Sequence, residues 1–156
     1  MAVTLNETPS GNRLHIGIFG KTNSGKSSFI NTFSGQKVSI VADVAGTTTD
    51  PVYKSMEIYP LGPCIIIDTA GFDDEGELGA LRIEKTSLAA QKTELAIILF
   101  CGDEMVQELK WYNYFKKRQT PVIPVLGKAD LYTQEQKEYL IQMIQKNTGE
   151  TVCPVS

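Results

Sequence analysis

The sequence predicts an α/β protein whose mostly parallel, six-stranded sheet is covered by helices. Three observations lead to this expectation. Short apolar runs alternate with helical patterns along the chain, and several runs are apolar throughout, as in strands buried on both faces. One such run leads through a glycine-rich loop into a helix. The 156 residues are enough for one domain.

Six strands are expected, each from its own pattern. The first is a β-branched run that ends at a glycine, and the second alternates apolar and polar residues. The third, fourth and fifth are apolar almost throughout, and the sixth begins within "TVCPVS" at the end of the chain. In chain order the strands are expected at residues 14–19, 52–59, 64–69, 94–100, 121–126 and 151–156.

Four helices are expected between these strands. They are placed at residues 26–35, 78–93, 103–118 and 133–146. Apolar residues at helical spacing define the inward faces of three of them: Phe29, Ile30 and Phe33; Met105, Leu109 and Tyr112; Leu140, Met143 and Ile144. Residues 1–13 are polar and without periodicity, so a flexible arm is expected before the domain at 14–156. No helix follows the sixth strand, and we expect the chain to be a piece of a longer protein.

Composition narrows the class of function. The net charge of −3 gives no reason to expect non-specific nucleic-acid binding, and no nucleic-acid partner is expected. The cysteines, Cys64, Cys101 and Cys153, are too widely spaced for a zinc site or a disulfide framework, and they are typical of reduced thiols in the cytoplasm. The apolar run at 95–101 is too short to span a bilayer, and no signal peptide opens the chain. No membrane association is expected.

A phosphate-binding loop is predicted at residues 20–27, "GKTNSGKS", which match G-x-x-x-x-G-K-[ST] between a strand and a helix. Backbone N–H groups of the loop and the helix N-terminus can hold two phosphates. Lys26 would reach the β- and γ-phosphates, and the Ser27 hydroxyl would bind Mg²⁺. Ser24, Gly25 and Ser28 belong to the same expected site. The alternative is a flexible glycine loop with a solvated lysine.

Two further segments support this site. "IIIDTAG" at 65–71 puts an acid at the carboxyl end of a buried strand, where ligands bind in open α/β sheets. Asp68 can hold Mg²⁺ through water, and the Gly71 N–H can meet the γ-phosphate. In "GTTTD" at 46–50, a threonine can close on Mg²⁺ and the γ-phosphate. Alone, an aspartate at a strand end is usually a turn or cap residue.

With these motifs the chain resembles P-loop GTPase domains of the translation-factor-related class, with their three-layer fold. It is more closely similar to the N-terminal GTP-binding domain of HydF, the potassium-dependent, TrmE/Era-like GTPase of FeFe hydrogenase maturation. The stretches that carry the resemblance are "NRLHIGIFGKTNSGKSSFIN", "VADVAGTTTDPVYKSMEIYPLGP" and "DTAGFDDEGELGALRIEKT", which cover most of residues 12–86.

The resemblance implies a K⁺ site and a magnesium threonine. Asn23 would bind K⁺ together with Thr47 and backbone carbonyls near Ala42 and Val44, and Thr48 would bind Mg²⁺. A monovalent cation between β- and γ-phosphate neutralises charge that develops during hydrolysis. The alternative is that Asn23 only hydrogen-bonds the loop. The residues expected to act in catalysis are Lys26, Thr48, Gly71 and Asn23.

Phe72 follows "DTAG", where some GTPases carry a glutamine that orients the attacking water. A phenyl ring cannot hydrogen-bond water, so slow turnover is expected.

"GKAD" at 127–130 differs by one residue from the guanine-binding NKxD pattern. Asp130 would accept two hydrogen bonds from guanine, and the Lys128 stem would lie over the base. The asparagine that contacts the base near N7 is replaced by Gly127, so a weakened guanine reader is expected. "CPVS" resembles the start of the last guanine-contacting loop, with Val155 and Ser156 at the base. The alternative is an ordinary strand-to-helix turn.

The expected function is binding of GTP and GDP, with slow hydrolysis stimulated by Mg²⁺ and K⁺, as a molecular switch in hydrogenase maturation. Its partners would be other maturation proteins and the dimerisation and iron–sulfur domains of a full-length protein. The single histidine, His15, is expected to be structural. One alternative is an interaction switch with negligible hydrolysis. Another is a GTPase associated with the ribosome or tRNA.

Overall fold

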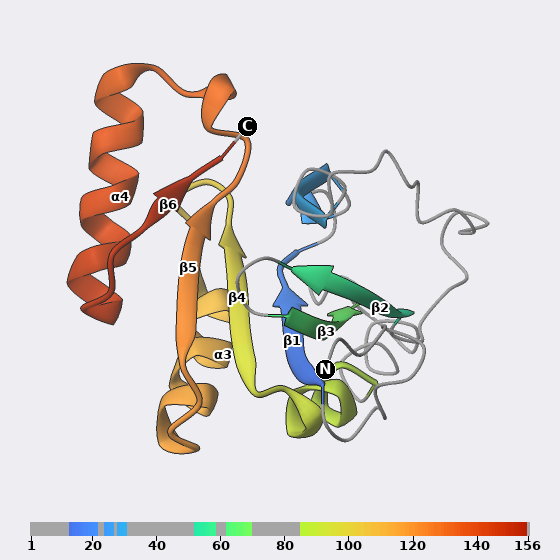
Figure 1. Cartoon of the computed structure of the whole chain (residues 1–156). Coiled ribbons are helices and arrows are strands. Elements are labelled where there is room, and N and C mark those ends of the chain that lie inside the picture. The colour runs from blue at the N-terminus through green and yellow to red at the C-terminus, as the bar shows by residue number, and fades with distance from the viewer. Residues whose placement is uncertain are drawn as a thin grey trace.

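A six-stranded sheet forms the centre of the protein in a computed structural model (Figure 1). The structure describes residues 13–21, 24–26, 28–30, 52–58, 62–69 and 85–155. The strands are β1 (Leu14–Phe19), β2 (Val52–Ile58), β3 (Gly62–Asp68), β4 (Leu95–Phe100), β5 (Val122–Leu126) and β6 (Cys153–Pro154). The helices with defined bounds are α3 (Val106–Lys117), the 3₁₀ helix η2 (Ala129–Leu131) and α4 (Gln134–Thr148). Residues 28–30 and 85–92 are also helical.

The strand order is β2-β3-β1-β4-β5-β6. β2 pairs antiparallel with β3, and every other pairing is parallel. The predicted fold class, a mostly parallel six-stranded sheet with helices, is therefore confirmed. Because β1 lies between β3 and β4 and runs parallel to both, the carboxyl ends of these three strands lie together at one edge of the sheet.

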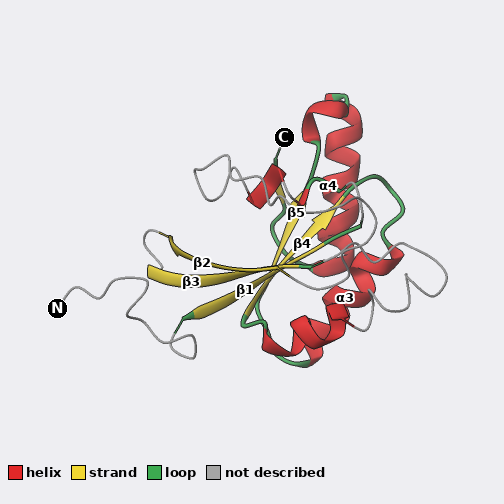
Figure 2. Ribbon diagram, turned by 90° about the vertical axis from the view of Figure 1, so that its right-hand side faces the viewer, coloured by secondary structure: helices red, strands yellow, loops and turns green. Residues whose placement is uncertain are grey.

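The side chains of β4 alternate between two apolar layers. Ala96, Ile98 and Phe100 belong to a cluster that includes residues of α3 and α4. Ile97 and Leu99 belong to a second cluster on the opposite face, which includes Ile30. Figure 2 shows α3 and α4 on the same side of the sheet. Strand β4 is therefore buried on both faces, as its apolar sequence predicts.

Helix α3 begins at Val106 rather than at residue 103, because Gly102 takes a left-handed turn with φ of 80° before it. Its buried face also differs from the prediction. Met105 and Tyr112 are buried as expected, but Leu109 is only partly buried. Glu108 and Phe115 are completely buried beside them. The sequence pattern could not indicate Glu108, since a carboxylate is seldom buried without a specific partner.

Helix α4 is longer than predicted, because it continues to Thr148. Its limits have clear local causes. Thr133 and Gln136 form a reciprocal capping box at the start, and Gly149 ends the helix with φ of 71°. Leu140 and Ile144 face the core as expected, and Met143 is partly buried against it.

The remaining elements agree with the prediction within their described parts. The strand expected at 64–69 begins two residues earlier, at Gly62, and the final strand has only two paired residues. The 3₁₀ helix η2 was not predicted. Outside the described residues lie residues 1–12 of the arm expected at 1–13, most of the helix expected at 26–35, including Phe33, and residues 78–84 of the helix expected at 78–93. In the described part of the chain, no helix combines the length and apolarity needed to cross a membrane.

Candidate functional site

The phosphate loop lies at the carboxyl end of β1, between that strand and helical residues 28–30. Gly25 has φ of 95°, a conformation that side-chain-bearing residues rarely adopt. Its carbonyl accepts the N–H of Phe29 at 2.8 Å, which starts the helix. The Lys26 Nζ donates to the carbonyls of Gly20 and Lys21, both at 3.1 Å, so its ammonium is held over the loop. This places a cation where phosphates would bind.

Asp68 is the last residue of β3 and pairs with Ile18 of β1, so its strand ends beside the start of the phosphate loop. The adjacent Thr69 is buried, and its hydroxyl donates to the Ile18 carbonyl at 2.7 Å. This bond fixes the strand end that carries Asp68. Among the described residues, no group of three or more His, Cys, Asp or Glu side chains could hold a metal alone. A single carboxylate suits Mg²⁺, which keeps several waters and binds phosphates.

The GKAD segment follows β5, and backbone hydrogen bonds fix it to both neighbouring strands. The Gly127 N–H donates to the Phe100 carbonyl at 2.9 Å, and the Ala129 N–H donates to the Val155 carbonyl at 2.8 Å. Val155 in turn donates to the Leu126 carbonyl at 2.9 Å. The last predicted guanine loop and the GKAD segment are therefore in direct contact.

Lys128 and Asp130 take different positions in this segment. Lys128 has a left-handed backbone, with φ of 56°, and is half-buried. A Cβ placed on Gly25 would lie 3.8 Å from the Cγ of Lys128, so the lysine stem passes over the phosphate loop. Asp130 is exposed at the start of η2. Its carboxylate is therefore open to solvent two residues after Lys128.

Two residues that position these loops were not singled out from the sequence. Glu108 of α3 is completely buried, and its carboxylate lies 3.5 Å from the Lys21 ammonium of the phosphate loop. The Tyr132 hydroxyl accepts the Gly102 N–H at 2.8 Å and joins the end of η2 to the loop after β4. Burial raises the pKa of Tyr132 above its ordinary value of 10.0. No local sequence pattern indicates these contacts, because Lys21 and Glu108, like Gly102 and Tyr132, are far apart in the chain.

Several predicted site residues cannot be placed. Those that lie outside the described residues are Asn23, Ser27, Ala42, Val44, Thr47, Thr48, Gly71 and Ser156. Phe72 lies outside them as well. The K⁺ site, the magnesium threonine and the γ-phosphate contact of Gly71 therefore stay predictions. Of the other residues assigned to the site, Ser24 is buried and Ser28 is exposed.

The histidine and the cysteines lie apart from these motifs or at their margins. His15 lies within β1, and its Nδ1 is 3.1 Å from the Glu94 carboxylate. All three cysteines are free thiols: Cys64 is buried, Cys101 is half-buried and Cys153 is exposed. Burial raises the pKa of Cys64 above the ordinary value of 9.0.

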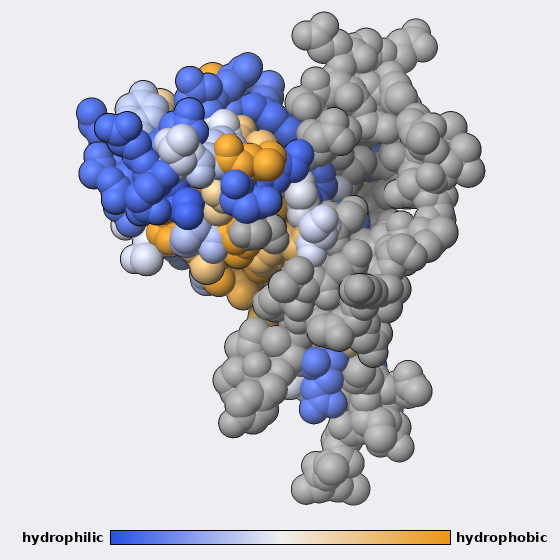
Figure 3. Space-filling model, turned by 90° about the horizontal axis from the view of Figure 1, so that it is seen from above, coloured by the Kyte–Doolittle hydropathy of each residue, from blue (hydrophilic) through white to orange (hydrophobic). Residues whose placement is uncertain are grey.

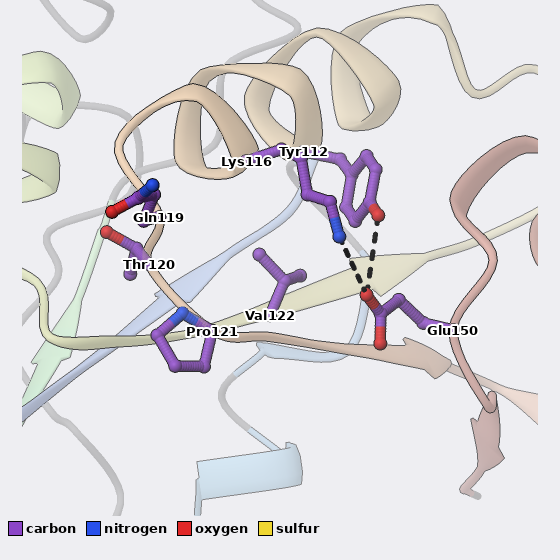
Figure 4. A pocket seen from close by; sticks show the side chains of 7 residues that line it. All are labelled: Tyr112, Lys116, Gln119, Thr120, Pro121, Val122 and Glu150. Carbon is purple, nitrogen blue, oxygen red and sulfur yellow. Dashed lines mark hydrogen bonds and ion pairs between the residues drawn. The ribbon is translucent and has the colours of Figure 1, made fainter.

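A cavity of about 300 Å³ lies at the other end of the sheet, beside the start of β5 (Figure 4). Pro121 and Val122 line it, and Tyr112 and Lys116 of α3 point toward Glu150. Lys116 and Glu150 are 3.6 Å apart. The cavity shares no residue with the predicted nucleotide site. Seen from the carboxyl ends of β4 and β5, the described surface is mainly hydrophilic, with smaller apolar areas (Figure 3).

Comparison with known proteins agrees with this geometry. A family model for 50S ribosome-binding GTPases matches residues 15–128. The GTPase Der of Wolinella succinogenes is 37% identical over 139 residues, which are 86% of this chain and 29% of that protein. The tRNA modification GTPase MnmE of Aliarcobacter butzleri is 36% identical over 150 residues, which are 90% of this chain and 32% of that protein.

A solved structure of Era with MgGDPNP and 16S ribosomal RNA nucleotides has a TM-score of 0.74 and 28% identity. The match covers 91% of this chain and 50% of that one. The predicted three-layer P-loop fold is confirmed by this likeness. This chain therefore spans half or less of the length of the relatives described.

Proposed function

The chain belongs to the family of 50S ribosome-binding GTPases, and we propose that it binds GTP and hydrolyses it slowly to GDP and phosphate. One observation carries the proposal: the Lys128 stem passes over Gly25 of the phosphate loop. A nucleotide whose phosphates lie at Lys26 would therefore present its base to Lys128 and Asp130. The carboxylate of Asp130 can accept from the guanine N1–H and N2 amine, a pair of donors that adenine lacks.

Mg²⁺ and K⁺ are proposed as the stimulating ions. Asp68 would hold Mg²⁺ through water, together with the Ser27 and Thr48 hydroxyls. Asn23, Thr47 and the backbone near Ala42 and Val44 would hold K⁺. The bound cations would neutralise negative charge on the transferring phosphoryl group. Support for the K⁺ site is the sequence resemblance, and support for the Asp68 role is its place beside β1.

Calorimetric titration with GDP and ADP, in buffer with Mg²⁺ and K⁺, tests the binding. GDP should bind and ADP should give no signal. Equal binding of both would contradict the guanine assignment. Phosphate release from GTP should then be faster in KCl than in NaCl at equal ionic strength. Turnover that is negligible in both salts would favour an interaction switch over an enzyme.

A role in hydrogenase maturation is the finer proposal, with partners among maturation proteins and with iron–sulfur and dimerisation domains in a longer cytoplasmic protein. Its support is the resemblance of residues 12–86 alone, since the relatives described above are Der and MnmE. Expression of the full-length protein in cells lacking their own maturation GTPase tests it. Restored hydrogenase activity is expected, and no restoration by a well-expressed protein would contradict it.

An RNA partner is a second candidate. The net charge gives no reason to expect one, but a GTPase associated with the ribosome or tRNA is an alternative among the functions expected from the sequence. The observation in its favour is the solved Era complex, which contains nucleotides 1506–1542 of 16S ribosomal RNA. Crosslinking of the full-length protein in cells, followed by sequencing of bound RNA, separates the two candidates. Specific enrichment of ribosomal RNA or tRNA would favour this second role.

A further inference from the structure

Gly127 of the base-reading segment lies against the backbone of the phosphate loop at Ser24. It is buried, and its N–H is fixed to the Phe100 carbonyl at 2.9 Å. A Cβ placed on Gly127 would lie 2.6 Å from the backbone carbonyl oxygen of Ser24. It would also lie 3.6 Å from the Cδ2 of Leu99 and 3.8 Å from the Phe100 carbonyl oxygen. A carbon atom cannot approach a carbonyl oxygen to 2.6 Å without displacing backbone.

Neither side of this contact can yield easily. Ser24 is 1% exposed, and its N–H donates to the Lys21 carbonyl at 3.1 Å. On the other side, β5 and the Ala129–Val155 bond hold the GKAD segment in place. Both partners at the contact are main-chain atoms, so rotation of a side chain cannot relieve a clash. Any side chain at position 127 would push the two loops apart.

We infer that Gly127 determines how guanine is read, by seating the base-reading segment directly on the backbone of the phosphate loop. This inference rests on the proposed function. Close packing of Gly127 on Ser24 takes the place of the asparagine side chain of the NKxD pattern. This packing keeps Lys128 over Gly25 and Asp130 next to the base. Residue 127 then makes no side-chain contact with the N7 edge of guanine. Base recognition depends on the groups that face the N1 and N2 edge.

This arrangement predicts that asparagine at position 127 weakens the site, although it restores the NKxD pattern. The test is titration of GDP into the native chain, Gly127→Ala and Gly127→Asn. Both variants should bind GDP at least about tenfold more weakly, because each adds a Cβ at the contact. Gly149→Asn is the matched control, since Gly149 ends α4 in open space and asparagine tolerates its left-handed backbone. It should bind GDP within about twofold of the native chain.

A second measurement uses only the native chain, so it tests the inference even if the variants do not fold. The native chain should bind 7-deaza-GDP and GDP within about twofold, because no side chain of residue 127 contacts N7. Gly127→Asn that binds GDP as tightly as the native chain would overturn the inference. So would a loss of tenfold or more with 7-deaza-GDP. Failure of the native chain to bind GDP at all would instead overturn the proposed function.

Discussion

The ammonium of Lys21, the second residue of the phosphate loop, lies 3.5 Å from the carboxylate of Glu108 in α3. The Lys21 side chain is 17% exposed and that of Glu108 is completely buried. Lys21 also donates to the Glu104 carbonyl, just before α3. The loop expected to hold phosphates is therefore tied to the start of a helix that packs on the sheet. Such an attachment reduces the freedom of the loop before a ligand arrives.

Removal of Lys21 should destabilise the fold more than neutralisation of Glu108. Lys21→Met leaves a buried carboxylate without this ammonium, which typically costs about 3–5 kcal/mol. Glu108→Gln keeps the shape of the side chain and removes the charge, so its cost should be smaller. Urea unfolding of both single variants and the double variant measures this. The double variant should be more stable than the sum of the single losses predicts. Simple additivity would contradict a direct interaction between the two side chains.

Lys26→Met should weaken GDP binding without preventing folding. The Lys26 ammonium donates to the carbonyls of Gly20 and Lys21 and would contact the phosphate oxygens of a bound nucleotide. Hydrogen bonds to charged groups contribute about 1.5–3 kcal/mol, so affinity should fall by roughly 10- to 150-fold. Calorimetry with GDP measures the loss. Lys146→Met, an exposed position near the end of α4, is the control and should bind normally. Equal affinities for the two variants would remove Lys26 from the site.

Asp130→Asn should change the preferred base from guanine to xanthine. The carboxylate accepts from the N2 amine of guanine, whereas an amide can donate to the carbonyl that xanthine carries at the same position. Competition between GDP and xanthosine diphosphate should shift by more than about tenfold toward the latter. Glu135→Gln, an exposed carboxylate in the first turn of α4, should leave the preference unchanged. An unaltered preference in Asp130→Asn would show that this side chain does not read the base.

The sequence predicted well what depends on local pattern. Apolar runs, with one alternating run, indicated the six strands, and the phosphate loop and GKAD were found as motifs because their spacing is typical of nucleotide-binding loops. Pairs that meet only in the folded chain could not be predicted. The buried Glu108 is explained by Lys21, which belongs to another element. The role of Gly127 likewise depends on Ser24, and a sequence pattern shows only that an asparagine is missing.

Thiol reactivity should follow exposure, in the order Cys153, Cys101 and Cys64. Cys153 is exposed, whereas Cys64 is buried in the apolar layer between β3 and Ile30. Burial raises the pKa of Cys64 above 9.0, so the reactive thiolate is scarce at pH 7.5. Because its folded pKa is raised, the protonated Cys64 thiol favours the native state up to about pH 9. That contribution is lost as the pH rises through the folded pKa.

Time-resolved alkylation at pH 7.5, followed by mass spectrometry of peptides, measures this order. Cys153 should be modified first and Cys64 only on the timescale of unfolding. Addition of urea below the unfolding midpoint should accelerate labelling of Cys64 far more than that of Cys153, because only the former must be uncovered. Cys153→Ser is the control that identifies the fast phase. Rapid labelling of Cys64 in the native chain would show that the layer beneath β3 opens without global unfolding.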